Sequence, residues 1–129
     1  MIDGAAIYAI DLEKMKRCYL ALGYQLLEEA ENDYATLGSQ DSELSLVQIP
    51  PAYAAGINIS SPPAARDETP IKLIFRVADL DAALATLQDH GGRPAEGSAR
   101  WTFRGFDLQD AIDPEGNVIQ LKAMAKAGQ

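Results

Sequence analysis

The hydrophobic pattern at the start of the chain predicts a buried strand followed by a helix with one apolar face. Residues 5–10 are almost entirely apolar, which is typical of a buried strand. Asp11 follows where a helix N-cap is expected, because a short carboxylate can accept from the free amides of the first turn. Apolar positions then recur at helical spacing: Leu12, Met15, Tyr19 and Leu22. Gly23 lies where a left-handed C-cap is expected, so the predicted helix ends there.

The same pattern recurs 68 residues further along the chain. Residues 71–77 form a second apolar stretch, Asp79 is a second N-cap and Gly91 a second C-cap. The apolar stripe between these caps consists of Leu80, Ala83, Leu84 and Leu87. Because caps and stripe agree at one offset, the sequence predicts a duplicated structural unit.

Each predicted helix is followed by three segments with strand character. They are residues 24–29, 34–38 and 43–49 after the first helix, and 93–96, 100–112 and 118–123 after the second. Asp113-Pro114-Glu115-Gly116-Asn117 is a strong hairpin-turn signal, since proline presets one turn position and glycine accepts a positive φ. The pattern is therefore βαβββ twice over.

The stretch between the two units predicts a connection rather than a third unit. Residues 50–70 are rich in Pro, Ala, Gly and Ser, with a possible short strand at 56–60. The prediction is one α+β domain over residues 1–129, with a first module at about 4–49 and a second at about 71–123.

The charge and composition narrow the classes of function. The chain of 129 residues has 19 acidic against 11 basic residues, a net charge of −8, which disfavours nucleic-acid and anionic-membrane partners. Its single cysteine, Cys18, allows no internal disulfide and fits the cytoplasm, where we expect the protein to reside. No apolar run approaches the roughly 18 residues of a membrane span, and the start of the chain lacks a basic signal-peptide region.

Most motif-based enzyme classes are not expected. The chain has one histidine, His90, at the end of the second predicted helix, where a cation favours the helix dipole. A Ser-His or Cys-His pair would have to use this residue, and GxSxG, HExxH and phosphate-loop motifs are absent.

Two motifs resemble the vicinal oxygen chelate superfamily of glyoxalases, bleomycin-resistance proteins and extradiol dioxygenases. One is the strand–Asp-Leu–helix–Gly element, seen at Asp11-Leu12 and Asp79-Leu80. The other is the run Asp113 to Leu121, which resembles that family's last hairpin and strand. The resemblance implies two curved sheets with their helices outside, which together form a half-barrel cup around a ligand. It also implies a homodimer, which is how members of this family usually cover their sheet edges.

The resemblance also implies four metal-ligand positions, and here they hold Gly4, Gln48, Lys72 and Gln120. Glycine offers no side chain, protonated lysine has no lone pair, and glutamines supply only neutral carbonyl oxygens. This set does not suit a divalent metal, which is held by imidazole or carboxylate groups, so we predict no metal and no cofactor. Two alternatives stay open for Gln48 and Gln120: ordinary hydrogen bonds, or hydrogen bonds to an organic ligand.

Strand alternation proposes further residues that face the ligand. If Lys72 faces the cup, Arg76 does too, and Tyr8 shares the face of Gly4. Trp101 and Phe103 alternate onto one face and are candidates for stacking on a planar or cationic ligand, although aromatic clusters in strands more often belong to the core. Asp107 and Asp110 either give the site negative charge or are simply exposed.

Two functional hypotheses follow from different classes. The first is a metal-independent protein that binds a small organic molecule, sequestering an antibiotic-like or aromatic ligand. The second is a glyoxalase-, lyase- or dioxygenase-like enzyme with an atypical site, in which Lys72, Arg76, Tyr8 or a carboxylate acts as acid or base. The missing metal ligands and the aromatic run favour the binding protein.

Overall fold

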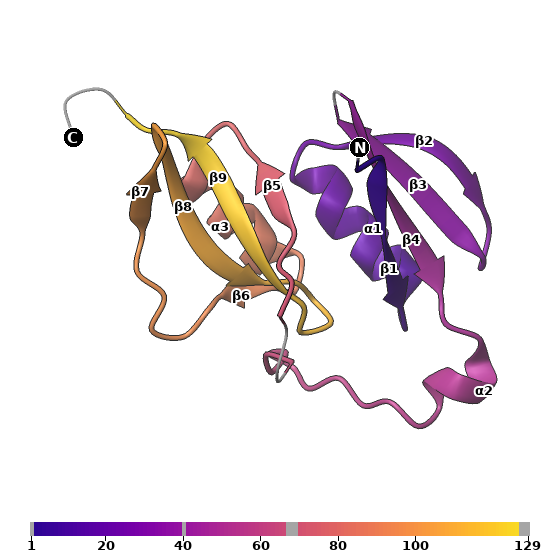
Figure 1. Ribbon diagram of the computed structural model, residues 1–129. Coiled ribbons are helices and arrows are strands. Elements are labelled where there is room, and N and C mark those ends of the chain that lie inside the picture. Colours follow the sequence, from indigo (N-terminus) through magenta and orange to yellow (C-terminus); the bar gives the residue numbers. More distant parts are fainter. Residues whose placement is uncertain (1, 40, 67–69, 127–129) are drawn as a thin grey trace. The chain divides into compact units, whose positions relative to one another are not determined.

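The chain folds into two units that share one α+β plan (Figure 1). The computed structural model describes residues 2–39, 41–66 and 70–126, and its two compact units comprise residues 1–59 and 60–129. None of the helices within the described ranges is long and apolar enough to cross a lipid bilayer.

The first unit is a four-stranded sheet with one helix. Its elements are β1 (Gly4–Ala9), α1 (Leu12–Ala21), β2 (Gln25–Ala30), β3 (Tyr34–Ser39) and β4 (Ser42–Gln48). The strand order is β1-β4-β3-β2, with β1 parallel to β4 and the other neighbours antiparallel. The helix connects β1 to the rest of the sheet, as a parallel first strand requires a crossover.

The second unit repeats this plan with one strand interrupted. Its elements are β5 (Ile74–Arg76), α3 (Leu80–Asp89), β6 (Arg93–Pro94), β7 (Trp101–Phe103), β8 (Phe106–Ile112) and β9 (Val118–Met124). The strand order is β5-β9-β8-β6, and β7 also pairs with β8. The short strands β6 and β7 therefore share the place that β2 occupies in the first unit.

The predicted helix caps are confirmed in both units. The Asp11 carboxylate accepts a hydrogen bond from the Lys14 amide at 3.1 Å, and the Asp79 carboxylate accepts one from the Asp81 amide at 3.2 Å. After the helices, Gly23 and Gly91 have φ values of 113° and 97°. These caps set both helix boundaries at the places that the sequence predicted.

Each helix covers one face of its own sheet, and the core of each unit lies between its helix and its sheet. The buried side chains of the first unit include Ala9, Leu12, Met15, Cys18, Tyr19, Leu37, Leu44 and Leu46. Those of the second include Phe75, Leu80, Leu87, Ala111, Ile119, Leu121 and Ala123. Because strand side chains alternate, the intervening residues of every strand lie on the face that looks away from the helix, which we call the far face.

The prediction of one strand over residues 100–112 was wrong. Residues 100–112 are not one strand but the hairpin of β7 and β8, with Arg104 and Gly105 at φ values of 55° and 82°. Positive φ at both central residues is the type I′ geometry that matches the twist of a two-residue hairpin. The sequence did not reveal this turn, because arginine rarely adopts a positive φ and is not a usual turn residue.

The connection between the units also differs from the prediction. It contains a short helix, α2 (Pro51–Ala54), and no strand at residues 56–60. Proline at the first helical position suits this turn, since its φ is preset and its missing amide is not needed there. Residues 67–69 of the predicted connection lie outside the described residues.

The turn between β8 and β9 is held by a buried carboxylate. Asp113 Oδ1 accepts hydrogen bonds from the Glu115 and Asn117 amides at 2.9 and 3.0 Å, and Oδ2 accepts one from Asn117 Nδ2 at 2.8 Å. Asp113 is fully buried. This carboxylate therefore fixes the hairpin that sets the register of β8 against β9.

Replacing Asp113 with alanine is expected to lower the free energy of unfolding by about 3 kcal/mol, because it leaves three buried or half-buried donors without their acceptor. Chemical denaturation of the purified variant measures this loss. Asp89→Ala, at an exposed position at the end of α3, is the matched control and is expected to change stability little. An unfolding midpoint for Asp113→Ala equal to that of the control would contradict the role of the carboxylate.

Candidate functional site

Cross-strand pairing places most of the predicted ligand-binding residues on the far face of the second sheet. Ile74, Gln120 and Asp110 are neighbours across β5, β9 and β8, and form one row. The next row runs through Arg76, Lys122, Leu108 and Trp101, and a third pairs Phe106 with Phe103. Directly opposed residues on one sheet face lie within side-chain contact of one another.

One end of this face combines two cations with an aromatic cluster. The Arg76 guanidinium carbon lies 4.4 Å from the centre of the Phe106 ring, and Lys122 Nζ lies 4.2 Å from it. The neighbouring side chains of Trp101 and Phe103 are 38% and 61% exposed. Cations over a ring face are attracted by its quadrupole, so the ring holds both charges beside exposed aromatic surface.

The other end carries an ion pair. Lys72 Nζ lies 2.7 Å from Asp110 Oδ2, and the two side chains are 36% and 20% exposed. Asp110 Oδ1 is buried and has no hydrogen-bond partner among the described residues. Lys72 thus lies at this face with its charge balanced by a neighbouring carboxylate.

Arg100 fixes the direction in which Trp101 points. Its guanidinium donates to Asp81 Oδ1 of α3 at 2.6 Å and to Gln109 Oε1 at 3.1 Å. The hydrogen bond from Arg100 holds the pKa of the Asp81 carboxyl below its usual value. Because neighbours on a strand point to opposite faces, anchoring Arg100 on the helix side sends Trp101 to the far face.

Gln48 lies on the helix side of the first sheet, not on the far face where the sequence placed it. Its Nε2 donates to the carbonyl oxygens of Ile10, Ile49 and Ala9 at 2.7, 3.1 and 3.2 Å, and its Oε1 accepts from the Leu12 amide at 3.2 Å. Gln48 thereby joins the end of β4 to the turn between β1 and α1. Both ends of its amide bind the backbone.

The strand registers also correct the match between the two glutamines. Ala6 pairs with Ser45 in the first unit, and Ile74, 68 residues after Ala6, pairs with Gln120 in the second. Ser45 is therefore the counterpart of Gln120. The resemblance pointed to Gln48 instead of Ser45, because the sequence gives no direct signal of strand register.

The remaining candidates of the first unit are Tyr8 and Gly4. Tyr8 is an exposed residue of β1 on the far face of the first sheet, where it pairs with Val47. Gly4 pairs with Glu43, and a Cβ at Gly4 would collide with the Glu43 carbonyl oxygen. Close approach of the two strands explains why glycine occupies this position.

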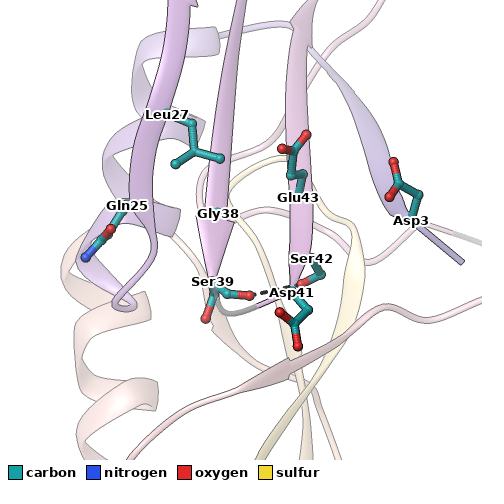
Figure 2. Close-up of a pocket in the computed structure, with 8 residues that line it drawn as sticks. All are labelled: Asp3, Gln25, Leu27, Gly38, Ser39, Asp41, Ser42 and Glu43. Atoms are coloured by element: carbon teal, nitrogen blue, oxygen red, sulfur yellow. Dashed lines mark hydrogen bonds between the residues drawn. The ribbon is translucent and has the colours of Figure 1, made fainter.

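The first unit also contains a cavity that the sequence did not predict. Its volume is about 410 Å³, and Figure 2 shows the carboxylates of Asp3, Asp41 and Glu43 around it. Its lining residues are Asp3, Gln25, Leu27, Gly38, Ser39, Asp41, Ser42 and Glu43. The size suits a small molecule and the charge suits a cation. No three His, Cys, Asp or Glu side chains within the described ranges are grouped to hold a metal ion.

Phe106 is a residue of this face that sequence analysis did not assign to the site, and for Asp110 it left open a role in the site or simple exposure. Treating residues 100–112 as one strand hid the fold-back that brings Phe103 opposite Phe106. If the turn had been placed correctly at Arg104-Gly105, alternation along β8 would have put Phe106 and Asp110 on one face. The β8–β9 register then puts that face on the side of Gln120.

The chain belongs to the glyoxalase/bleomycin resistance protein/dioxygenase superfamily, whose family model matches residues 1–121. A search of curated proteins found no significant match.

Solved structures share this fold over nearly the whole chain. A glyoxalase/bleomycin resistance protein from Albidiferax ferrireducens T118 is 21% identical with a TM-score of 0.66, and 97% of this chain and 99% of that one are covered. A lactoylglutathione lyase from Agrobacterium tumefaciens is 19% identical with a TM-score of 0.59, covering 95% and 92%. A hypothetical protein from S. aureus is 13% identical with a TM-score of 0.66, covering 95% and 96%. These likenesses show the fold.

The residues at the positions that the family resemblance assigns to a metal do not fit one. Lys72 donates to Asp110, Gln48 has both amide atoms on backbone groups, and Gly4 has no side chain. Ser45, the structural counterpart of Gln120, is hydrogen-bonded to Thr36 at 2.9 Å. A hydroxyl and an amide are weak ligands for a divalent ion compared with carboxylate and imidazole.

Replacing Gln48 with glutamate is expected to lower the free energy of unfolding by about 3 kcal/mol, since a carboxylate oxygen would face carbonyl oxygens that now accept hydrogen bonds. Thermal and urea unfolding measure the loss. Gln25→Glu makes the same chemical change at an exposed strand position and is expected to alter stability by less than about 0.5 kcal/mol. Equal free energies of unfolding for the two variants would refute the stabilising role assigned to the hydrogen bonds of Gln48.

Proposed function

We propose that this protein binds small planar organic anions, without a metal ion, on the far face of its second sheet. The observation that carries the proposal is the pair of cations, Arg76 and Lys122, over the Phe106 ring beside exposed Trp101 and Phe103. An aromatic plane stacks on such side chains, and its carboxylate meets the ammonium of Lys122.

The charge of this face favours an anion over the cationic ligand that sequence analysis considered for stacking on Trp101 and Phe103. The net charge of −8 belongs to the entire sequence, whereas a ligand interacts with the few side chains it touches. Lys122, which takes part in none of the ion pairs found among the described residues, lies at the aromatic end, and Asp110 at the other end is balanced by Lys72. The local sign therefore decides the ligand class.

Binding is better supported than catalysis by the groups first considered as acid or base. Lys72 is engaged in an ion pair with Asp110 at 2.7 Å, an arrangement that suits a hydrogen-bond donor to a ligand. Arginine does not release its proton under physiological conditions, so Arg76 is a binding group. The family includes enzymes, and this chain acts as a binding protein of the same fold.

We also propose a cytoplasmic homodimer that carries no divalent metal. Native mass spectrometry of protein purified without added metal is expected to give twice the chain mass with no bound ion. Near one zinc, nickel, iron or manganese per chain would refute metal independence. A monomer mass throughout the micromolar range would refute the dimer.

The binding site is tested by calorimetric titration with 2-naphthoate. Trp101→Ala is expected to weaken binding by about 2 kcal/mol through lost stacking and burial, with a small change in melting temperature because Trp101 lies outside the helix-facing core. Lys122→Gln is expected to weaken the binding of 2-naphthoate and to leave the affinity for a neutral naphthalene alcohol unchanged. Tyr53→Ala removes an exposed aromatic side chain of α2, 73% exposed, and is the control without effect.

Two results would overturn the proposal. One is an affinity for 2-naphthoate that is absent or unaffected by Trp101→Ala. The other is preferential binding of naphthylmethylammonium that is lost in Glu43→Gln, because that outcome would assign the ligand to the acidic cavity of the first unit.

A further inference from the structure

The two ends of the far face of the second sheet differ in net charge. At one end, Lys122 lies over Phe106, and it takes part in none of the ion pairs found among the described residues. At the other end, Lys72 and Asp110 form an ion pair whose formal charges cancel. Gln120, directly opposite Asp110 on β9, adds a neutral amide at this same end.

We infer that this site selects singly charged ligands that carry a neutral hydrogen-bonding group opposite their anionic group, and that Asp110 is the residue that enforces this choice. The inference rests on the proposed function and specifies its substrate class. Lys122 receives the carboxylate, and the Lys72–Asp110 pair with Gln120 receives the neutral group.

The neutral end offers donors but no uncompensated positive charge. An ammonium has three protons, and Lys72 uses one of them on Asp110 Oδ2. The others, with the amide of Gln120, suit a carbonyl oxygen such as that of an ester or amide. Asp110 Oδ1 is buried with no hydrogen-bond partner among the residues described, so the carboxylate keeps negative potential there. A second ligand carboxylate would meet that potential.

Strand geometry gives the length of such a ligand. Asp110 lies one row from Lys122, and Phe106, over which the ammonium lies, is a further row away. Rows on one face are two residues apart, which corresponds to roughly 7 Å along a strand. The two ligand groups are therefore separated by roughly 7 to 13 Å, the span of two fused aromatic rings with substituents at opposite ends.

The experiment compares two probes that differ at the distal end by one methyl group and one negative charge: naphthalene-2,6-dicarboxylate and its monomethyl ester. Calorimetry on the wild-type protein is expected to show the monoester binding about tenfold more tightly, since apposed like charges are penalised. In Asp110→Asn the neutral end becomes cationic, and the preference is expected to reverse in favour of the dicarboxylate.

Lys72→Met is expected to change the ratio of the two affinities in the opposite direction to Asp110→Asn. It leaves Asp110 as an unbalanced carboxylate, so both probes bind more weakly and the monoester preference rises above its wild-type value. A residue that merely maintained the sheet would change both affinities alike and leave their ratio unaltered. Circular dichroism confirms folding, and the wild-type and Lys72→Met ratios decide the question if Asp110→Asn does not fold.

The outcomes separate this inference from the proposed function. Equal or tighter binding of the dicarboxylate to the wild-type protein overturns the selectivity assigned to Asp110 and leaves the anion site intact. Absence of binding by both probes and by 2-naphthoate overturns the two together. A tighter monoester whose advantage is unchanged in both variants refutes the role of the Lys72–Asp110 pair.

Discussion

Burial of alternate strand side chains beneath a single helix is the constraint on which both units depend. Each helix is only ten residues long, too short to be stable alone, and is held by its apolar stripe against the sheet. Leu46 and Leu121 occupy matching places in the last strands, where each packs on the helix side. Since the helix covers one set of side chains, most of the other set lies outside the helix-facing core, although Leu108 is buried on the far face.

That division explains how one backbone plan supports two different surfaces. Positions 68 residues apart in the first strands hold Gly4 and Lys72, or Tyr8 and Arg76. Their partners differ as well, because Val47 is opposite Tyr8 whereas Lys122 is opposite Arg76. Most helix-facing side chains are apolar in both units, and the polar one at the end of β4, Gln48, has its amide hydrogen-bonded to the backbone. The two far faces, which the helices do not cover, differ in their chemistry.

The same reasoning separates whole-molecule charge from the chemistry of a site. Acidic residues line the cavity of the first unit, whereas two cations gather over one ring of the second. Exposed charges more than about 8 Å apart are largely screened at physiological ionic strength. A net charge of −8 is therefore compatible with a face that prefers anions.

The sequence alone determined the features that depend on local chemistry and periodicity. The caps Asp11 and Asp79, both helices, the duplication and the turn at Asp113 follow from residue type and spacing over a few positions. So did the sharing of one face by Trp101 and Phe103 within their strand, because alternation within a strand needs no tertiary information.

Tertiary structure decided what depends on pairing between distant strands. Register made Ser45 rather than Gln48 the counterpart of Gln120, and it brought Lys72 to Asp110, 38 residues away. The turn at Arg104-Gly105 brought Phe103 opposite Phe106, although arginine gives little signal for a positive φ. A shift of one residue exchanges the two faces of a strand at almost no local cost, so only the packing of the whole sheet selects the register.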